Sequence, residues 1–310
     1  MALFFRKQHD AAYEAFDRGD LHEAARRFAE LALAKPKNAS YHYMLGLAHK
    51  YLRQWEPSLR ANLRSLEVRD DIDQASAWNG AIAATALGDW ARARELWAKC
   101  GVPLPPGEGP IDEDFGTVAV RLNPWGDGET LFAQRIDPAR ARLRNVPLPS
   151  SGFRGDDVVL HDGACRGERR YGDGVVPVFD VLQRLEQSAY ETYGVFATCA
   201  TPADAEAMLA LRHADVGVIE DWTASVSHLC LRCSYGTPHE HAAPREARAW
   251  ESERSFGFAA RDAVAVDALV AAWLAGGADR RVESIEVGVA PLSAPADGSL
   301  WWDDPEDDAS

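Results

Sequence analysis

A repeated pattern of small, aromatic and proline residues in the first hundred positions constrains the fold more than any other feature. A glycine, an alanine, an aromatic residue and a proline recur at offsets 0, 5, 9 and 17, first as Gly19, Ala24, Phe28 and Pro36 and then as Gly88, Ala93, Trp97 and Pro105. The copies are 69 residues apart, which is twice 34 plus one. Small residues let paired helices approach closely, aromatic residues fill the gap between units, and prolines end helices. The pattern therefore predicts stacked helix pairs.

Residues 5–106 resemble the tetratricopeptide repeat family, whose unit is a helix-turn-helix of 34 residues. The resemblance implies an all-α helical repeat domain over residues 1–106. Such stacks present a concave surface that binds peptides or protein surfaces. Polar residues of the first helices are the candidate groove positions, namely His42, His49 and Asn79.

The middle unit departs from the family pattern. Ser58, Asn62 and Asp70 stand where the family has an alanine, an aromatic residue and a proline. About three units are the minimum for a stable stack, so this unit is needed despite its polar positions.

Charge is distributed unevenly along the chain. The net charge is −15, yet the first hundred residues carry 15 Lys and Arg against 13 Asp and Glu, a balance of +2, which leaves −17 for the remainder. This change supports a domain boundary near residue 100. An acidic second half repels the phosphate backbone of nucleic acids and attracts a basic protein. The alternative is that the acidity serves only solubility.

Composition and sequence ends favour a cytoplasmic protein. No apolar run is long enough to span a bilayer, and the N-terminal residues lack the pattern of a signal peptide. Five cysteines, an odd number with one C-x2-C pair, fit a reducing compartment better than a disulfide framework.

The middle of the chain changes from helices to short strands. A proline- and glycine-rich linker at 107–111 precedes a β-rich segment at 112–188. Five strands are predicted in it, at 117–122, 129–136, 141–146, 157–161 and 175–179, followed by a helix at 180–188. Short strands at this spacing indicate a small barrel or a curled sheet. The run from Val146 through Gly155 and Asp156 resembles small bacterial barrel domains of unknown function.

A cysteine and histidine cluster predicts a zinc knuckle within residues 228–242. Cys230, Cys233, His239 and His241 have the spacing C-x2-C-x5-H-x-H, and Gly236 and Pro238 between the pairs favour a turn. Two thiolates and two imidazoles suit the tetrahedral coordination of Zn²⁺. With four protein ligands the site is closed, so a structural role for the zinc is favoured over a catalytic one.

Two β-α-β patterns flank the cluster and predict a ferredoxin-like α+β sandwich over residues 189–295. In this prediction the second and third strands are edge strands, far apart across the sheet, and the zinc knuckle bridges them. The alternative is that the middle strands join the same sheet, so that 112–295 forms one domain. The last segment, 296–310, is acidic and predicted to be a flexible tail.

Two other clusters allow a catalytic interpretation. If only three of the four ligands bound zinc, a water would fill the fourth position and Glu240 would be the candidate general base. Asp156, Asp157, His161 and Asp162 also fit an acid–base or metal cluster, although aspartates next to strands are commonly turn residues.

The sequence favours a non-enzymatic protein that binds a basic protein partner and contains a structural zinc. An immunity protein that occludes a toxin and an adaptor or chaperone are two forms of this hypothesis. A zinc-dependent hydrolase is the first alternative. A zinc knuckle that binds nucleic acid is the second, against which the charge argues.

Overall fold

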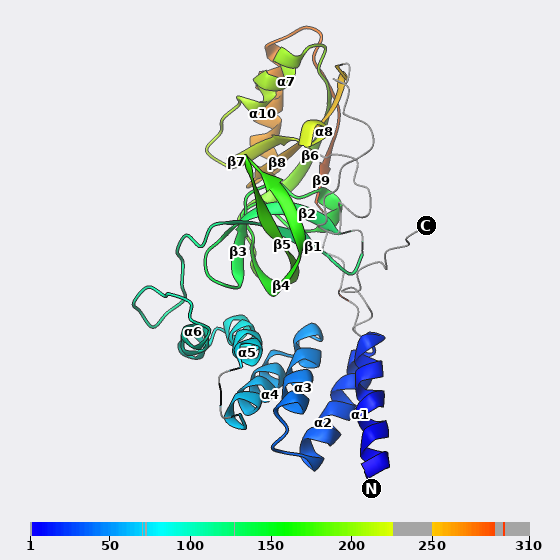
Figure 1. Ribbon diagram of the computed structural model, residues 1–310. Helices are drawn as coiled ribbons and strands as arrows, with labels where there is room; N and C mark the ends of the chain where they lie inside the picture. Colours follow the sequence, from blue (N-terminus) through cyan, green and yellow to red (C-terminus); the bar gives the residue numbers. More distant parts are fainter. Residues whose placement is uncertain are drawn as a thin grey trace.

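The computed structural model (Figure 1) describes residues 2–225 except 70, 72 and 127, together with residues 250–288 and residue 294. Six helices are followed by a strand-rich part, which confirms the predicted combination of an all-α region with an α+β region. No described helix is both long and apolar enough to cross a membrane.

The first hundred residues form six consecutive helices. Their bounds are α1 Ala2–Asp17, α2 Leu21–Ala34, α3 Ala39–Tyr51, α4 Trp55–Glu67, α5 Gln74–Leu87 and α6 Trp90–Lys99. Side-chain caps begin several of them, because Asp20 accepts from Glu23 N and Asn38 accepts from Tyr41 N. Gly88 ends α5 in the left-handed region, with φ of 69°. Ala24, Phe28, Ala93 and Trp97, the residues of the repeated pattern, are all buried.

Two polar positions of the middle unit, Ser58 and Asn62, are buried as well, and each donates a hydrogen bond. Ser58 Oγ donates to the carbonyl of Gly46 at 2.8 Å, and Asn62 Nδ2 donates to the carbonyl of Ser58 at 2.9 Å. A Cβ on Gly46 would lie 2.5 Å from Asn62 Nδ2. Glycine therefore allows α3 and α4 to approach closely where the family pattern uses alanine and an aromatic ring.

Five strands close into a barrel in the order β1-β2-β3-β4-β5. Their bounds are β1 Thr117–Leu122, β2 Glu129–Arg135, β3 Arg140–Leu143, β4 Val158–Tyr171 and β5 Gly174–Glu186. Neighbouring strands are antiparallel, except that β1 and β5 pair in parallel at the closure. The interior is filled by aliphatic and aromatic side chains, among them Val120, Leu143 and Val159.

The helix predicted at 180–188 is wrong, because β5 continues as a strand to Glu186. Phe179 and Val181 belong to the barrel core, whereas Leu182 and Leu185 pack against the helices. A strand covered on both faces carries apolar residues on both faces, and its apolar spacing then resembles that of a helix.

A second sheet follows, with strand order β7-β8-β6-β9. The elements are β6 Glu191–Thr198, α7 Pro202–Leu209, β7 Val216–Asp221, α8 Trp222–Ser225, β8 Glu253–Ala260, α10 Ala263–Ala275 and β9 Arg281–Val287. All three strand pairs are antiparallel. Buried side chains of α7 and α10, such as Met208, Val266 and Trp273, pack with Phe256 and Phe258 of β8. We call this part, residues 191–288, the sandwich. The middle strands form a separate barrel and do not join its sheet.

The predicted positions of the second and third strands in this sheet are wrong. β7 and β8 are hydrogen-bonded neighbours, from Val216 opposite Ala260 to Asp221 opposite Phe256, and β8 is central. The connection between them joins adjacent antiparallel strands. No zinc knuckle is therefore needed to bridge distant edges of the sheet, and the zinc prediction rests on ligand spacing alone.

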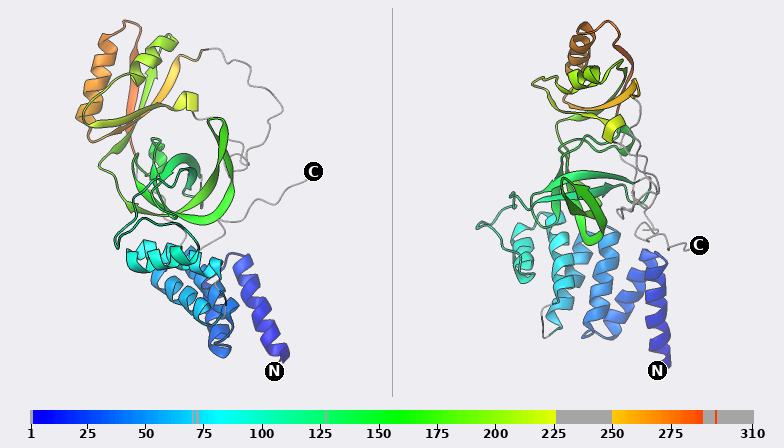
Figure 2. Two further views of the ribbon diagram at one scale, coloured as in Figure 1. Left: turned by 60° about the vertical axis from the view of Figure 1, so that its left-hand side comes forward. Right: turned by 45° about the horizontal axis from the view of Figure 1, so that its top comes forward.

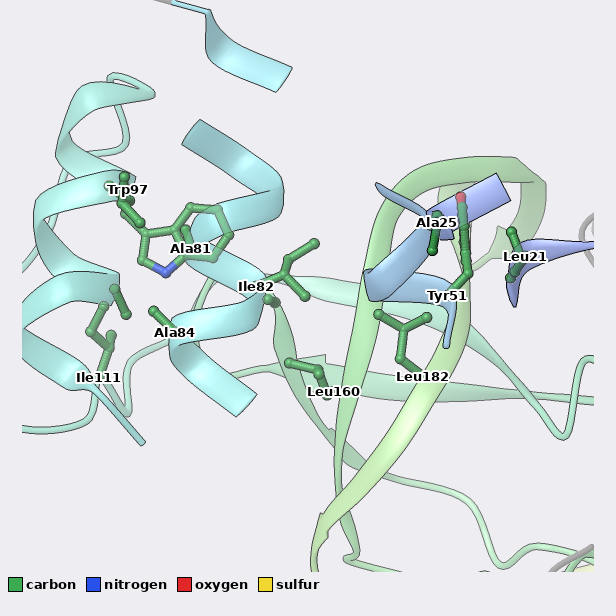
Figure 3. Close-up of a cluster of buried hydrophobic side chains, with 14 residues drawn as sticks. Leu21, Ala25, Tyr51, Ala81, Ile82, Ala84, Trp97, Ile111, Leu160 and Leu182 are labelled. Carbon is green, nitrogen blue, oxygen red and sulfur yellow. The ribbon is translucent and has the colours of Figure 1, made fainter. Parts of the chain in front are cut away.

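The barrel lies between the helices and the sandwich (Figure 2). Leu160 of β4 and Leu182 of β5 share one buried cluster with Tyr51 of α3 and with Ala81 and Ile82 of α5. Figure 3 shows these strand side chains directed towards the helices. The chain's own barrel therefore covers α5 and the end of α3, the helices on which the candidate groove residues lie.

Candidate functional site

The predicted zinc ligands Cys230, Cys233, His239 and His241, together with Glu240, lie outside the described residues, as does the 296–310 tail. Within the described ranges, no three His, Cys, Asp or Glu side chains are grouped so that they could hold a metal ion.

The predicted acid–base cluster of the middle segment is divided between separate places. Asp157 is fully buried, and its carboxylate accepts hydrogen bonds from Arg154 N at 3.0 Å and Ser188 N at 2.8 Å. It also pairs with Arg184 at 3.3 Å. Through these contacts Asp157 connects the segment before β4 with the end of β5. Its neighbour Asp156 is exposed and has φ of 70°, as expected for a turn aspartate.

Asp162 lies at the contact between the barrel and the helices. Its Oδ1 is 2.6 Å from Lys50 Nζ, and both side chains are almost completely buried. Lys50 Nζ also donates to Asn79 Oδ1 at 3.2 Å. Burial acts to raise the pKa of Asp162, but the charge of Lys50 and its hydrogen bond outweigh burial and lower that pKa. The Asp162 carboxyl group is therefore ionised, and its contact with Lys50 joins α3 and α5 to β4.

A second buried ion pair network lies next to this contact. Asp180 of β5 accepts from Arg121 Nε at 2.7 Å and from Arg166 Nε at 3.0 Å. Burial raises the pKa of Asp180, although both arginines act to lower it. Burial and the charge of Asp162 raise the pKa of the Tyr51 hydroxyl well above its ordinary value. The ion pairs of Asp180 join strands β1, β4 and β5 within the barrel, and Tyr51 of α3 lies beside them.

His161 is inaccessible to a substrate. Its ring is 1% exposed and stacks on Phe179 with centroids 4.8 Å apart, and its Nδ1 lies 2.8 Å from the carbonyl oxygen of Asp162. Burial lowers the pKa of this imidazole to about 4, so it is neutral at pH 7.

The candidate groove residues do not form a common open surface. Asn79 is 7% exposed and contacts Lys50, so its assignment to an open groove is wrong. His42 is also buried, and its Nε2 lies 3.0 Å from the carbonyl oxygen of Pro36. His49 contacts Gln54 Oε1 at 2.7 Å, and burial lowers its pKa.

The face of the sandwich sheet that α7 and α10 leave uncovered is covered at one end by Trp222. A Cβ on Gly257 would lie 2.3 Å from the Trp222 ring, and one on Gly194 would lie 3.3 Å from it. The indole Nε1 donates to the carbonyl of Val146 in the barrel at 3.0 Å. The paired glycines thus let an indole lie flat between sheet and barrel.

The other end of the same face forms a cleft of about 460 Å³, which we call the sheet cleft. It is lined by Phe196, Ala197, Thr223, Glu253, Arg254, Ser255 and Glu283. Phe196 of β6 stands between Ser255 of β8 and Ser284 of β9 in the strand register. Two residues further along β6, on the same face of the sheet, Thr198 is opposite Glu253 of β8.

The charges around the sheet cleft leave it acidic. Arg254 forms a largely buried ion pair with Asp221, and its guanidinium lies 4.7 Å from the Trp250 ring. Glu283 accepts a hydrogen bond from the Thr198 hydroxyl, which is uncharged. Among the described residues, neither Glu253 nor Glu283 has a cationic partner within salt-bridge distance. Both carboxylates are exposed.

Sequence reasoning did not identify the sheet cleft. Its residues lie on three strands, and their common position depends on the pairing of β6 with both β8 and β9. The only available signal is the alternation of polar and apolar residues around Phe196 and Ser255, which indicates a face but not its neighbours.

Comparisons with known proteins do not identify a family. No protein-family model matches the chain, and no curated protein matches it. One similar solved structure is described as a CopN-Scc3 complex, with 19% identity and a TM-score of 0.30 over 31% of this chain and 56% of that one. Another is a hypothetical protein from Neisseria gonorrhoeae, with 10% identity and a TM-score of 0.27 over 57% of this chain and 96% of that one. Neither likeness identifies a function.

Proposed function

We propose that this chain is a non-enzymatic binding protein whose partner is a basic protein. The observation that carries the proposal is the sheet cleft, where Glu253 and Glu283 flank Phe196. A concave site with an aromatic floor and a few polar groups is typical of binding sites. Two carboxylates that have no cationic partner among the described residues attract a basic surface and repel an acidic one.

The contacts between the parts of the molecule support a binding role. Lys50 and Asp162 fix the helices to the barrel, and Trp222 fixes the sandwich to the barrel. A surface that is held in place before binding loses less conformational entropy when a partner associates. The predicted acid–base residues Asp157, His161 and Asp162 are engaged in buried contacts, which favours binding over hydrolysis.

We further infer that residues 5–106 are tetratricopeptide-like repeats and that the sandwich is ferredoxin-like. The buried alanine and aromatic positions of the helix pairs support the first inference, and the strand order β7-β8-β6-β9 with two helices supports the second. Because the barrel covers α5 and the end of α3, we expect the partner to meet the sandwich rather than this part of the repeat surface.

Affinity purification tests the proposed function. The full chain is used as bait in cells of its source, beside an unrelated acidic protein of equal net charge. We expect one basic protein to be recovered in stoichiometric amount with the chain and not with the control bait. Recovery of no such protein, or equal recovery on both baits, would contradict the proposal. A toxin as partner would identify an immunity protein, and another cellular protein would identify an adaptor or chaperone.

The structural zinc held by Cys230, Cys233, His239 and His241 remains a proposal from the sequence. Elemental analysis of the purified chain should give one zinc per molecule. In the Cys233→Ser variant the zinc should be lost and the sandwich destabilised, while the helices remain folded. Equal metal content in the parent and the variant would refute the assignment.

A further inference from the structure

We infer that the sheet cleft binds an arginine side chain of the partner, with the guanidinium group between Glu253 and Glu283. The inference rests on the proposed function, which it makes more specific. It would be a recognition site on the sandwich, separate from the buried ion pairs that join the helices and the barrel.

The strand register places the two carboxylates on opposite sides of β6. Glu253 of β8 is opposite Thr198 of β6, and Glu283 of β9 accepts a hydrogen bond from the same threonine. Neighbouring strands are about 4.8 Å apart, so the two outer strands are separated by roughly 10 Å. A planar cation that enters over β6 can therefore approach both carboxylates, with Phe196 one row further along the strand.

The charge of the sheet cleft selects a cation. The positive side chain among its described lining residues, Arg254, is already neutralised by Asp221 in a pair whose side chains are 9% exposed. Glu253 and Glu283 contribute two further negative charges without a cationic partner in the described ranges. An anionic ligand would face net repulsion, whereas a cation would gain from both carboxylates.

The floor of the cleft favours arginine over lysine. A guanidinium group can stack on an aromatic ring such as Phe196 while its edge donates hydrogen bonds to carboxylates. Arginine forms such bonds in a planar fork, whereas a lysine ammonium acts as a more strongly hydrated point charge. The cleft volume of about 460 Å³ is in the range of ligand sites.

The test uses N-acetyl-arginine-N-methylamide, which has both a guanidinium group and amide carbonyls. It is titrated into the ¹⁵N-labelled full chain beside the citrulline analogue, which has nearly the same shape but no charge, and the lysine analogue. We expect amide shifts at Thr223, Arg254 and Ser255 with the arginine compound, weaker shifts with the lysine compound, and none with citrulline. Equal shifts with arginine and citrulline would overturn the inference.

The variant Glu253→Gln/Glu283→Gln should weaken binding of the arginine compound roughly tenfold or more, because it removes two charge-assisted contacts. Glu251→Gln, an exposed glutamate outside the cleft lining, is the matched control and should bind as the parent does. Amide spectra unchanged elsewhere verify the fold. If the double variant still captures the partner with unchanged affinity, the arginine inference fails while the proposed function stands. If the full chain recovers no specific partner, the proposed function itself fails.

Discussion

At the scale of single residues, Lys50 is the clearest test of how the helices and the barrel are joined. In Lys50→Met, the carboxylate of Asp162 loses its cation inside a buried contact. Removing one partner of a buried pair costs about 3–5 kcal/mol. We expect a loss of this size in the free energy of unfolding, measured with urea.

Two further variants make this prediction specific. Lys99→Met removes an ion pair with Glu95 in which both side chains are at least 40% exposed, and it should cost less than about 1 kcal/mol. The double variant Lys50→Met/Asp162→Leu leaves no charge unpaired and should recover part of the lost stability. Equal losses for Lys50→Met and Lys99→Met would contradict the role of the buried pair.

Glu129 gives a pH-dependent prediction. Its carboxylate accepts from Leu148 N at 3.0 Å, and burial raises its pKa from 4.5 to about 7, to which Glu220 adds. A carboxyl group with a raised folded-state pKa binds more protons folded than unfolded. Its contribution to stability is therefore full below pH 4.5 and is lost as the pH rises through 7. Glu129→Gln should be more stable than the parent at pH 8, by about 2 kcal/mol, with no gain at pH 4.

The measurement for Glu129 compares variant and parent at each pH. His161 acts in the opposite direction, because its pKa of about 4 is below the unfolded value of 6.5 and its contribution is lost as the pH falls. Both proteins contain His161, so its effect cancels in the difference. A difference that does not change between pH 4 and pH 8 would rule out the raised pKa of Glu129.

At the scale of elements, the glycine pair under Trp222 determines how the sandwich meets the barrel. A Cβ at Gly257 would lie 2.3 Å from the indole, and that ring is held between sheet and barrel. Gly257→Ala should displace Trp222, expose it to water and cost about 1–3 kcal/mol. A red shift in tryptophan emission and faster proteolysis between barrel and sandwich would be the expected signals. Gly276→Ala serves as the control, because its shortest contact, 2.5 Å, is with the end of the flexible Arg280 side chain, and the Trp273 carbonyl oxygen lies 3.3 Å away.

Elements whose ends are marked by turn residues or caps were well predicted from the sequence. The strand at 117–122 and the helix pairs agree with β1 and with α1 to α6, because turn residues and caps mark their ends. The segment 180–188 was predicted wrongly because Phe179 and Leu182 face different cores. Sequence periodicity reports how many faces of a segment are apolar, but not which neighbour covers each face.

At the scale of the whole molecule, contacts between parts could not be predicted from the sequence. In the sequence, Asn79 has the properties of a groove residue, and it is the packing of the barrel on α5 that buries it. The sheet cleft likewise depends on the pairing of β6 with both β8 and β9. Polar side chains such as Lys50 and Asp162 are equally suited to a surface or to a buried pair. Their roles depend on long-range packing that local patterns do not encode.

The shared core of helices and barrel predicts that they unfold together. Ile82 of α5 and Leu160 of β4 belong to one buried cluster, beside the Lys50 contact (Figure 3). In native-state hydrogen exchange, the most protected amides of α5 and β4 should therefore exchange with equal free energies of opening. Opening of α5 that costs several kcal/mol less than opening of β4 would show that the helices fold independently of the barrel.

The contact between Lys50 and Asp162 also has an evolutionary consequence. The two residues are 112 positions apart, yet neither charge can be lost alone without leaving the other buried and uncompensated. Descendants of this chain should therefore change both positions together, to two apolar residues or to a pair of reversed sign. The same constraint opposes exchange of the helical part between distant lineages, because a recombined chain would inherit one half of the ion pair.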